Sequence, residues 1–376
     1  MSTEIALAQS AQPAKSTQQI PSPSQVQTSH SQATTYLSWG LIGGTVMVAG
    51  LVRLLGIDLP GWVQYAPFVV SALLLGLPHG AVDHFVPFWV TGRPITAGRM
   101  AGIVAIYVAL AGLYMGWWIV SPATAFVGFI VMTWLHWGQG DRHAVVHLHG
   151  GRHVTTQAQG WALGAVRGGL PMIVPLLSHP SVYQEVALAT TTLFGLGTAA
   201  SLDWFFTTQA RWLLGSGFGL LVLGSLAASW PGLGAYGGVQ DDELRAMKWI
   251  SWRRDLLETG LLLLFFVVVP PLLAVGIYFC FWHALRHIER LQRLEPVMAA
   301  GVAAGRSSQA KRWLRFFALS APLTVAALGL LVGLYVVVPN PPTDMAGFLG
   351  LYLALIAALT FPHTLLVSWM DLRPGA

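Results

Sequence analysis

The sequence predicts an all-α membrane protein: a polytopic bundle of about eight to ten transmembrane helices with a histidine-lined metal site in its core. Of the 376 residues, 55% are hydrophobic and 9% are charged, whereas a soluble domain carries about 25% charged residues. The chain also contains a series of apolar runs near the ~20-residue length that spans a bilayer. Histidines inside these runs point to function, because an ionisable group is costly there.

The first residues differ in composition from the rest of the chain. Residues 1–35 are rich in Ser, Gln, Thr, Ala and Pro and show no apolar period, so we expect a disordered tail. No basic segment is followed at once by an apolar stretch, and a cleaved signal peptide is not expected. Residues 36–376 are predicted to form a single transmembrane helical domain.

Ten apolar runs follow the tail, and each is a candidate transmembrane helix. Two runs, 185–205 and 212–229, are short and glycine-rich, and Arg167 and Pro171 interrupt a third. Eight spans are therefore the alternative to ten. The runs are 36–57, 62–89, 100–120, 123–140, 158–178, 185–205, 212–229, 256–285, 314–338 and 347–370.

Positive charge orients these spans. Segment 286–315 holds seven Lys and Arg against two Glu, a net of 7 − 2 = +5, and loops 90–99 and 141–157 hold two arginines each. Loops 178–184 and 339–346 contain neither Lys nor Arg. With ten spans the three basic segments share one side, which the positive-inside rule identifies as cytoplasmic. We therefore expect a multi-pass protein of the cell (inner) membrane with both termini in the cytoplasm.

Other features narrow the function. Cys280 is the single cysteine, which excludes an internal disulfide or a thiolate cluster. The basic residues lie in loops between apolar runs, so they indicate topology and not a nucleic-acid partner. Segment 230–255 carries charges of both signs together with Trp249 and Trp252, and it resembles an interfacial helix.

Histidines lie in four motifs within the apolar runs. In the expected topology the second, fourth, eighth and tenth spans cross the membrane in the same direction, and their histidines fall at similar depth near the cytoplasmic ends. The motifs are Gly76-Leu77-Pro78-His79-Gly80-Ala81-Val82-Asp83-His84, Trp134-Leu135-His136-Trp137-Gly138-Gln139-Gly140-Asp141, Phe281-Trp282-His283-Ala284-Leu285-Arg286-His287 and Phe361-Pro362-His363.

This arrangement predicts a metal site in the bundle core. His283 and His287 are four residues apart, on one face of a helix. Neutral imidazole suits Fe, Zn, Cu and Ni, and an all-histidine set favours one metal ion over a carboxylate-bridged pair. Asp83 and Asp141 are candidates to accept the second ring N–H of a ligand. The alternative is that each histidine is a hydrogen-bonded packing residue.

A second group of histidines and the aromatic residues have competing interpretations. His143, His147, His149 and His153 follow the fourth span, and we expect them in a solvated loop, with metal binding by this group as the alternative. The sixteen Trp and seventeen Phe exceed what two interfacial belts need. Those beside the histidine motifs either line a flat apolar tunnel for a conjugated ligand or pack against helices and lipid.

Three of these motifs resemble a known family, the Brp/Blh membrane β-carotene 15,15′-dioxygenases, which supply retinal to microbial rhodopsins. The resemblance extends from about residue 60 to the C-terminus. Its motifs are the strings 78–84, Trp134-Leu135-His136-Trp137-Gly138 and Trp282-His283-Ala284-Leu285-Arg286-His287.

The resemblance implies one non-haem Fe(2+) bound by His79, His136, His283 and His287. It demotes His363 to the surroundings of the site. No catalytic side chain beyond the metal ligands is expected. The candidates for supporting or pocket roles are Asp83, His84, Trp137, Asp141, Trp282 and His363.

The resemblance also implies the reaction. O2 cleaves the central 15,15′ double bond of β-carotene and two retinal molecules form. A site within the ~30 Å hydrocarbon core suits a substrate that dissolves there. The lipid bilayer is the expected surrounding, and a retinal-binding rhodopsin is a candidate partner.

Two other functions remain as alternatives. A membrane di-iron hydroxylase or desaturase needs HxxxH and HxxHH boxes, but the chain has only the HxxxH pairs His283/His287 and His143/His147 and no adjacent His-His pair. A non-enzymatic haem-binding, metal-binding or rhodopsin-assembly protein would use two of the histidines or none.

Overall fold

The computed structural model describes residues 23–57, 59–195, 202–233, 239–304 and 308–373, and these residues form helices and no strand. The helices are α1 (Pro23–Leu54), α2 (Gly61–Val70), α3 (Gly76–Ala81), α4 (Val86–Thr91), α5 (Ala97–Val120), α6 (Pro122–His143), α7 (Gln157–Ser178), α8 (Pro180–Thr191), α9 (Asp203–Phe206), α10 (Thr208–Ala228), α11 (Val239–Val268), α12 (Pro271–Tyr278), α13 (Leu285–Leu294), α14 (Pro296–Ala303), α15 (Gln309–Val337) and α16 (Met345–Asp371). The all-α prediction is confirmed. Helix α1 begins at Pro23, within the expected tail, and residues 1–22 lie outside the described part.

The described part contains seven helical segments long and apolar enough to cross a membrane, fewer than the eight to ten expected. They are Thr34–Leu54, Gly61–Thr91, Ala97–Val120, Gln157–Ser178, Thr208–Ala228, Gln309–Val337 and Met345–Asp371. The expected run 256–285 is divided because α11 ends at Val268 and proline occupies positions 270 and 271, where proline lacks the N–H that a continuing helix needs. The expected run 185–205 contains only the end of α8, the short α9 and residues outside the described part. The polar second half of α6 lowers the hydropathy of that helix.

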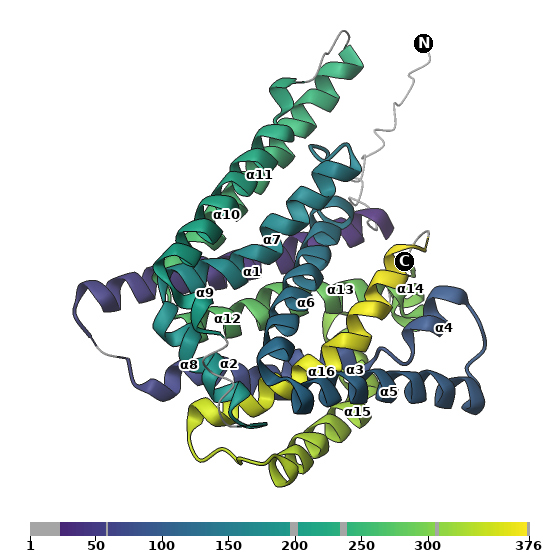
Figure 1. Cartoon of the computed structure of the whole chain (residues 1–376). Coiled ribbons are helices and arrows are strands. Elements are labelled where there is room, and N and C mark those ends of the chain that lie inside the picture. The colour runs from purple at the N-terminus through teal and green to yellow at the C-terminus, as the bar shows by residue number, and fades with distance from the viewer. Residues whose placement is uncertain (1–22, 58, 196–201, 234–238, 305–307, 374–376) are drawn as a thin grey trace, which may run out of the picture.

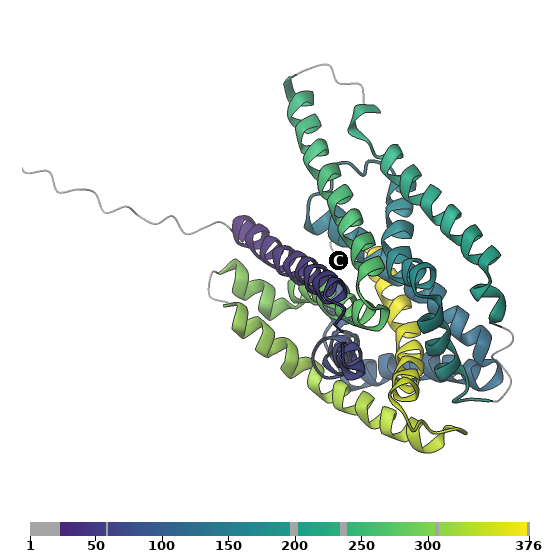
Figure 2. The same ribbon diagram turned by 90° about the vertical axis from the view of Figure 1, so that its left-hand side faces the viewer.

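Helices α3, α6, α13 and α16 lie in the middle of the bundle, and α10 and α11 rise above it (Figures 1 and 2). Within the segment 230–255, residues 239–255 form the first half of α11 and residues 234–238 lie outside the described part; its place at the membrane interface stays a prediction. The Trp252 indole N–H donates to the Leu226 carbonyl of α10 at 3.0 Å.

Glycines bring α6 and α7 into backbone contact. A Cβ added at Gly138 would lie 2.0 Å from the carbonyl oxygen of Gly164, and one at Gly168 would lie 1.9 Å from the carbonyl oxygen of Trp134. Small residues spaced by four let two membrane helices approach this closely. The contact fixes the position of the part of α6 that carries His136.

A cluster of buried charges joins α6, α7, α11 and α13. The side chain of Arg167 is fully buried and lies 2.7 Å from Asp255, 2.9 Å from Glu258 and 3.4 Å from Asp141. Arg286 pairs with Asp141 and lies 3.4 Å from Glu258. Because unpaired charge is costly in an apolar interior, these pairs explain how Arg167 is accommodated within an apolar helix.

A glycine substitution tests the α6–α7 contact. Gly168→Ala places a methyl group against backbone that cannot rotate away, so we expect the free energy of unfolding to fall by about 1–3 kcal/mol, the usual cost of overpacking. Unfolding of the purified protein in mixed detergent measures this. Gly217→Ala on α10 is the control, since a Cβ there meets nothing within 4 Å. Equal stability of the two variants would contradict the close approach.

An arginine substitution tests the charge cluster. Arg167→Leu leaves three carboxylates short of a cation, and removing one partner from a buried ion pair costs about 3–5 kcal/mol. We expect a corresponding loss of thermal stability in detergent. Arg152→Ala, at an exposed position of the 149–156 loop, should leave stability unchanged. A wild-type melting temperature for Arg167→Leu would show that the cluster does not hold these helices.

Candidate metal centre

Five buried histidines meet in the middle of the bundle. His79 lies on α3, His136 on α6, His287 on α13 and His363 on α16, while His283 lies in the π-helical segment Phe279–Ala284 between α12 and α13. Each of the five residues is 2–6% exposed to solvent. The four motifs that are distant in the sequence thus share one place in the fold.

The rings contact one another edge to face. The His363 ring centroid lies 4.7 Å from that of His136, 5.0 Å from His79 and 5.1 Å from His287. The His283 ring centroid lies 4.9 Å from His136 and 5.8 Å from His79, and the His79 and His287 centroids are 5.6 Å apart. Six contacts of this kind place all five rings in one cluster.

Two neighbouring sets of side chains, with no residue in common, each offer donor atoms close enough to share an ion. The donor atoms of His79, His136 and His283 lie within 4.8 Å of one another, as do those of Asp83, His287 and His363. Imidazoles bound to one ion through nitrogens about 2.1 Å away place their centroids about 4.5–5.5 Å apart when their bonds are separated by about 90–120°. The observed ring separations are close to this range.

The ring nitrogens provide a second indication of a missing partner. The Nε2 atoms of His136, His283, His287 and His363 are buried and have no hydrogen-bond partner among the described residues. Buried polar atoms in proteins are otherwise almost always paired. The opposite nitrogens of two rings are held: Nδ1 of His79 lies 3.2 Å from the Leu75 carbonyl, and Nδ1 of His363 lies 2.6 Å from Asp83. This donor set fits a metal ion.

Irregular helix turns position two of the rings. The π-helical segment Ser71–Leu75 precedes His79, and Phe279–Ala284 contains His283. A π turn rotates the residues after it relative to those before it, and such turns are frequent at functional sites. Gly76 is required at the first of them, because a Cβ there would lie 2.8 Å from the Ser71 carbonyl oxygen and 2.9 Å from Phe279.

The supporting candidates separate into two groups. Asp83 contacts His363, and Trp137 packs 5.5 Å from His283. Asp141 instead accepts from Arg286 and from the Trp282 indole N–H, which lies 2.9 Å away. Asp141 and Trp282 therefore belong to the charge cluster. The His84 ring packs on Phe85 at 4.0 Å and makes none of the contacts of the five-ring cluster.

One residue of the site gave no signal in the sequence. The Tyr107 hydroxyl of α5 donates to Asp83 Oδ2 at 3.0 Å and lies 3.1 Å from the Leu359 carbonyl oxygen. Tyr107 is a lone tyrosine in an apolar run, with no neighbouring polar residue to mark it. Only the fold brings it to Asp83.

The four histidines that follow the fourth predicted span do not all lie in a solvated loop, and His143 is the last residue of α6. His153 is 2% exposed, and its Nε2 lies 3.3 Å from Asp255. His149 lies 3.0 Å from the Thr35 hydroxyl, and burial, followed by the nearby Arg286, lowers the pKa of His149 to about 2. The His143 and His147 rings lie 4.9 Å apart, with His147 exposed. None of the four joins the central cluster.

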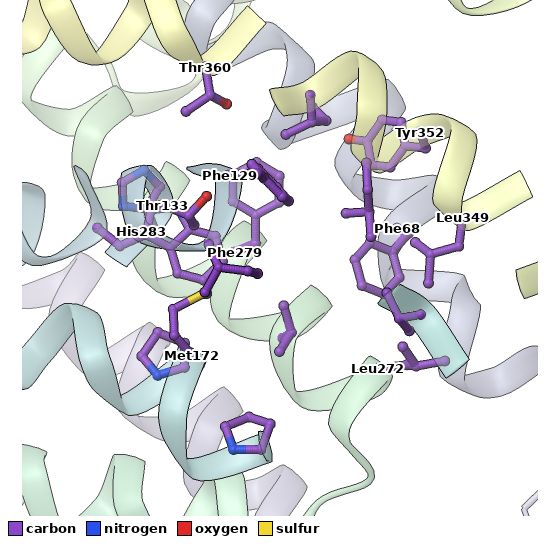
Figure 3. Close-up of a pocket in the computed structure, with 18 of the residues that line it drawn as sticks. Phe68, Phe129, Thr133, Met172, Leu272, Phe279, His283, Leu349, Tyr352 and Thr360 are labelled. Atoms are coloured by element: carbon purple, nitrogen blue, oxygen red, sulfur yellow. The ribbon is translucent and has the colours of Figure 1, made fainter. Parts of the chain in front are cut away.

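An apolar cavity opens onto the cluster (Figure 3). His79, His136, His283 and His363 all line it, whereas His287 lines a smaller polar cavity beside Arg286 and Arg290. Figure 3 shows His283 and Thr133 at one end. Most of the remaining wall is hydrophobic, including Phe68, Phe129, Met172, Leu272, Phe279 and Leu349. A long hydrocarbon is the ligand that such a wall suits.

Comparisons with known proteins agree with this arrangement. The family model for beta-carotene 15,15′-dioxygenase matches residues 70–371. The chain is 38% identical over 335 residues to the probable beta-carotene 15,15′-dioxygenase Blh of Halobacterium salinarum, covering 88% of this chain and 91% of that protein. It is 26% identical over 330 residues to the probable beta-carotene 15,15′-dioxygenase Brp of the same species, covering 85% of this chain and 87% of the other.

A bacterial relative lies further away. The beta-carotene 15,15′-dioxygenase of uncultured marine bacterium 66A03 is 23% identical over 323 residues, which cover 84% of this chain and 96% of the relative. No solved structure matches the chain significantly. The family model covers more than half of the sequence and includes all five clustered histidines. The chain belongs to the β-carotene 15,15′-dioxygenase family.

Proposed function

We propose that this protein cleaves β-carotene at its central 15,15′ double bond with O2 and releases two molecules of retinal, at a single Fe(2+) bound by His79, His136, His283 and His287. One C=C bond is broken and two C=O bonds form, and both atoms of O2 enter the products. The balance needs no external reductant. The observation that carries the proposal is the histidine cluster at the end of a hydrocarbon-lined cavity.

The bound iron would supply redox chemistry for the activation of O2, which no side chain in the cavity offers. Imidazole is a suitable ligand for iron. The residues of this chain would bind and orient the polyene, because Phe129 and Phe279 present flat apolar surfaces beside His283 (Figure 3). The apolar wall would also exclude water from the reacting bond.

The membrane supports the same proposal. A carotenoid dissolves in the ~30 Å hydrocarbon core, and seven segments of the described chain suit that environment. We further propose that the basic segments 90–99, 141–157 and 286–315 face the cytoplasm of the cell (inner) membrane. Both termini lie on that side when the chain crosses the membrane an even number of times, as with the ten spans expected from the sequence. A retinal-binding rhodopsin would be the acceptor of the product.

Retinal formation in cells tests the reaction and the site together. The chain is expressed in cells that accumulate β-carotene, and retinal is quantified by chromatography. We expect retinal from the wild type and at least about a hundredfold less from His283→Ala, because a ligand is lost at a site where supporting residues alone are worth 10–100-fold. His147→Ala, at an exposed position outside the cluster, should retain wild-type yield.

Two outcomes would contradict the proposal in different ways. Longer apocarotenals in place of retinal would show that the enzyme cleaves a double bond other than the central 15,15′ bond. If β-carotene stays intact although the protein is shown to be inserted in the membrane and loaded with iron, the proposed reaction is contradicted.

A cavity-filling substitution tests the substrate site apart from the metal. Val275 of α12 lines the cavity, and Val275→Trp should abolish most retinal formation while iron content stays unchanged, because the indole occupies the space of the polyene. Val267→Trp, at a position that is 43% exposed on α11, is the control. Full activity of Val275→Trp would show that the substrate lies elsewhere.

A further inference from the structure

His363 occupies the place of a ligand in the cluster. Its ring contacts the rings of His79, His136 and His287, at centroid separations of 4.7–5.1 Å. Those separations are among the shortest in the cluster. His363 also lines the apolar cavity, which His287 does not. A residue at the periphery of the site would contact one ring, not three.

A contact with Asp83, on the side of the ring that carries Nδ1, fixes the orientation of His363. Its Nδ1 lies 2.6 Å from Oδ2 of Asp83, which is in the turn between α3 and α4. Since an ionised carboxylate only accepts, Nδ1 carries the proton and Nε2 has a free lone pair. Metal-binding histidines almost always donate their other N–H to a carboxylate or a carbonyl in this way.

Tyr107 fixes Asp83 in turn. Its hydroxyl donates to the same Oδ2 at 3.0 Å, and it lies 3.1 Å from the carbonyl oxygen of Leu359, one turn before His363. The three side chains come from α5, the α3–α4 turn and α16. They form a continuous chain of contacts that ends at the free Nε2 of His363.

The charge of Asp83 requires a cation in the cluster. Asp83 is 2% exposed, and His363 is its only ion-pair partner among the described residues. Asp141, which is 3% exposed, has two arginines as ion-pair partners. A buried carboxylate without a cation is strongly unfavourable. A divalent ion on the Nε2 side of His363 would supply the missing positive charge through the ring.

No other partner for Nε2 suits the site. The atom is buried and without a hydrogen-bond partner in the described chain, and the proposed substrate is a hydrocarbon that cannot donate to it. We therefore propose that His363 is a fifth imidazole ligand of the metal, positioned by Asp83 and Tyr107. This inference rests on the proposed function, because it adds a ligand to the same centre.

Cobalt binding tests the fifth ligand without any need for activity. The full chain is purified in detergent, stripped of metal and titrated with Co(2+). Visible absorption then reports the coordination of the ion, and competition with a chelator gives its affinity. We expect His363→Ala to change the absorption bands and to weaken binding, and added imidazole to restore both. Asp83→Asn should weaken binding about 10–100-fold, as loss of a supporting carboxylate commonly does.

Tyr107→Phe and His84→Ala complete the set. Tyr107→Phe removes one hydroxyl and should weaken Co(2+) binding less than Asp83→Asn does. His84→Ala removes a histidine adjacent to Asp83 that lies outside the cluster, so its spectrum should match the wild type. If His363→Ala does not fold, Asp83→Asn and Tyr107→Phe decide, because both keep the His363 ring.

The contradicting results are distinct. Wild-type spectrum and affinity in folded His363→Ala, together with loss of binding in His283→Ala, would overturn the fifth ligand and leave the four-histidine centre intact. Failure of the wild type to bind any metal would overturn the proposed centre itself.

Discussion

Every buried polar group in an apolar helix bundle must find its partner inside the protein, and this constraint organises the structure. The bundle contains two large polar clusters. In the first, Arg167, Arg254 and Arg286 face Asp141, Asp255 and Glu258, so that cationic and anionic side chains are equal in number. In the second, the Nε2 atoms of His136, His283, His287 and His363 have no partner, and Asp83 has no Lys or Arg as an ion-pair partner, among the residues that the structure describes. The charges of the first cluster balance within the protein, whereas the second is balanced when it holds a cation.

The two clusters share a helix, which links stability to the site. Trp282 and Arg286 contact Asp141, while their neighbours His283 and His287 belong to the histidine cluster. On α6, Asp141 belongs to the charge cluster and His136 belongs to the histidine cluster. The glycine contact with α7 holds that helix in place. The charge cluster therefore fixes the backbone positions from which three of the histidines extend. A change at Arg167 would reach the site through this backbone, without contact to any ligand.

The sequence predicted the class and much of the site, because both depend on local signals. Few charges and long apolar runs indicate a membrane bundle, and matched depth of four histidine motifs predicted that His79, His136, His283 and His363 would meet. Seven segments of the described chain are long and apolar enough to span a membrane, against the eight to ten expected, and one difference is that Pro270 and Pro271 divide the run 256–285. Arg167 was interpreted as an interruption of a span, since its partners Asp255 and Glu258 are about 90 residues away. Tyr107 carries no mark in sequence, and its role depends on a contact made only in the fold.

The central claim is that the histidine cluster binds one iron ion. Elemental analysis of the purified chain tests this claim most directly. The protein would be prepared in detergent from iron-supplied cells, and bound metals would be measured against protein concentration. One iron per chain is the predicted result, because the ring contacts join all five histidines into a single cluster. Two irons per chain would support a di-iron enzyme, and the absence of bound metal would contradict a metal centre.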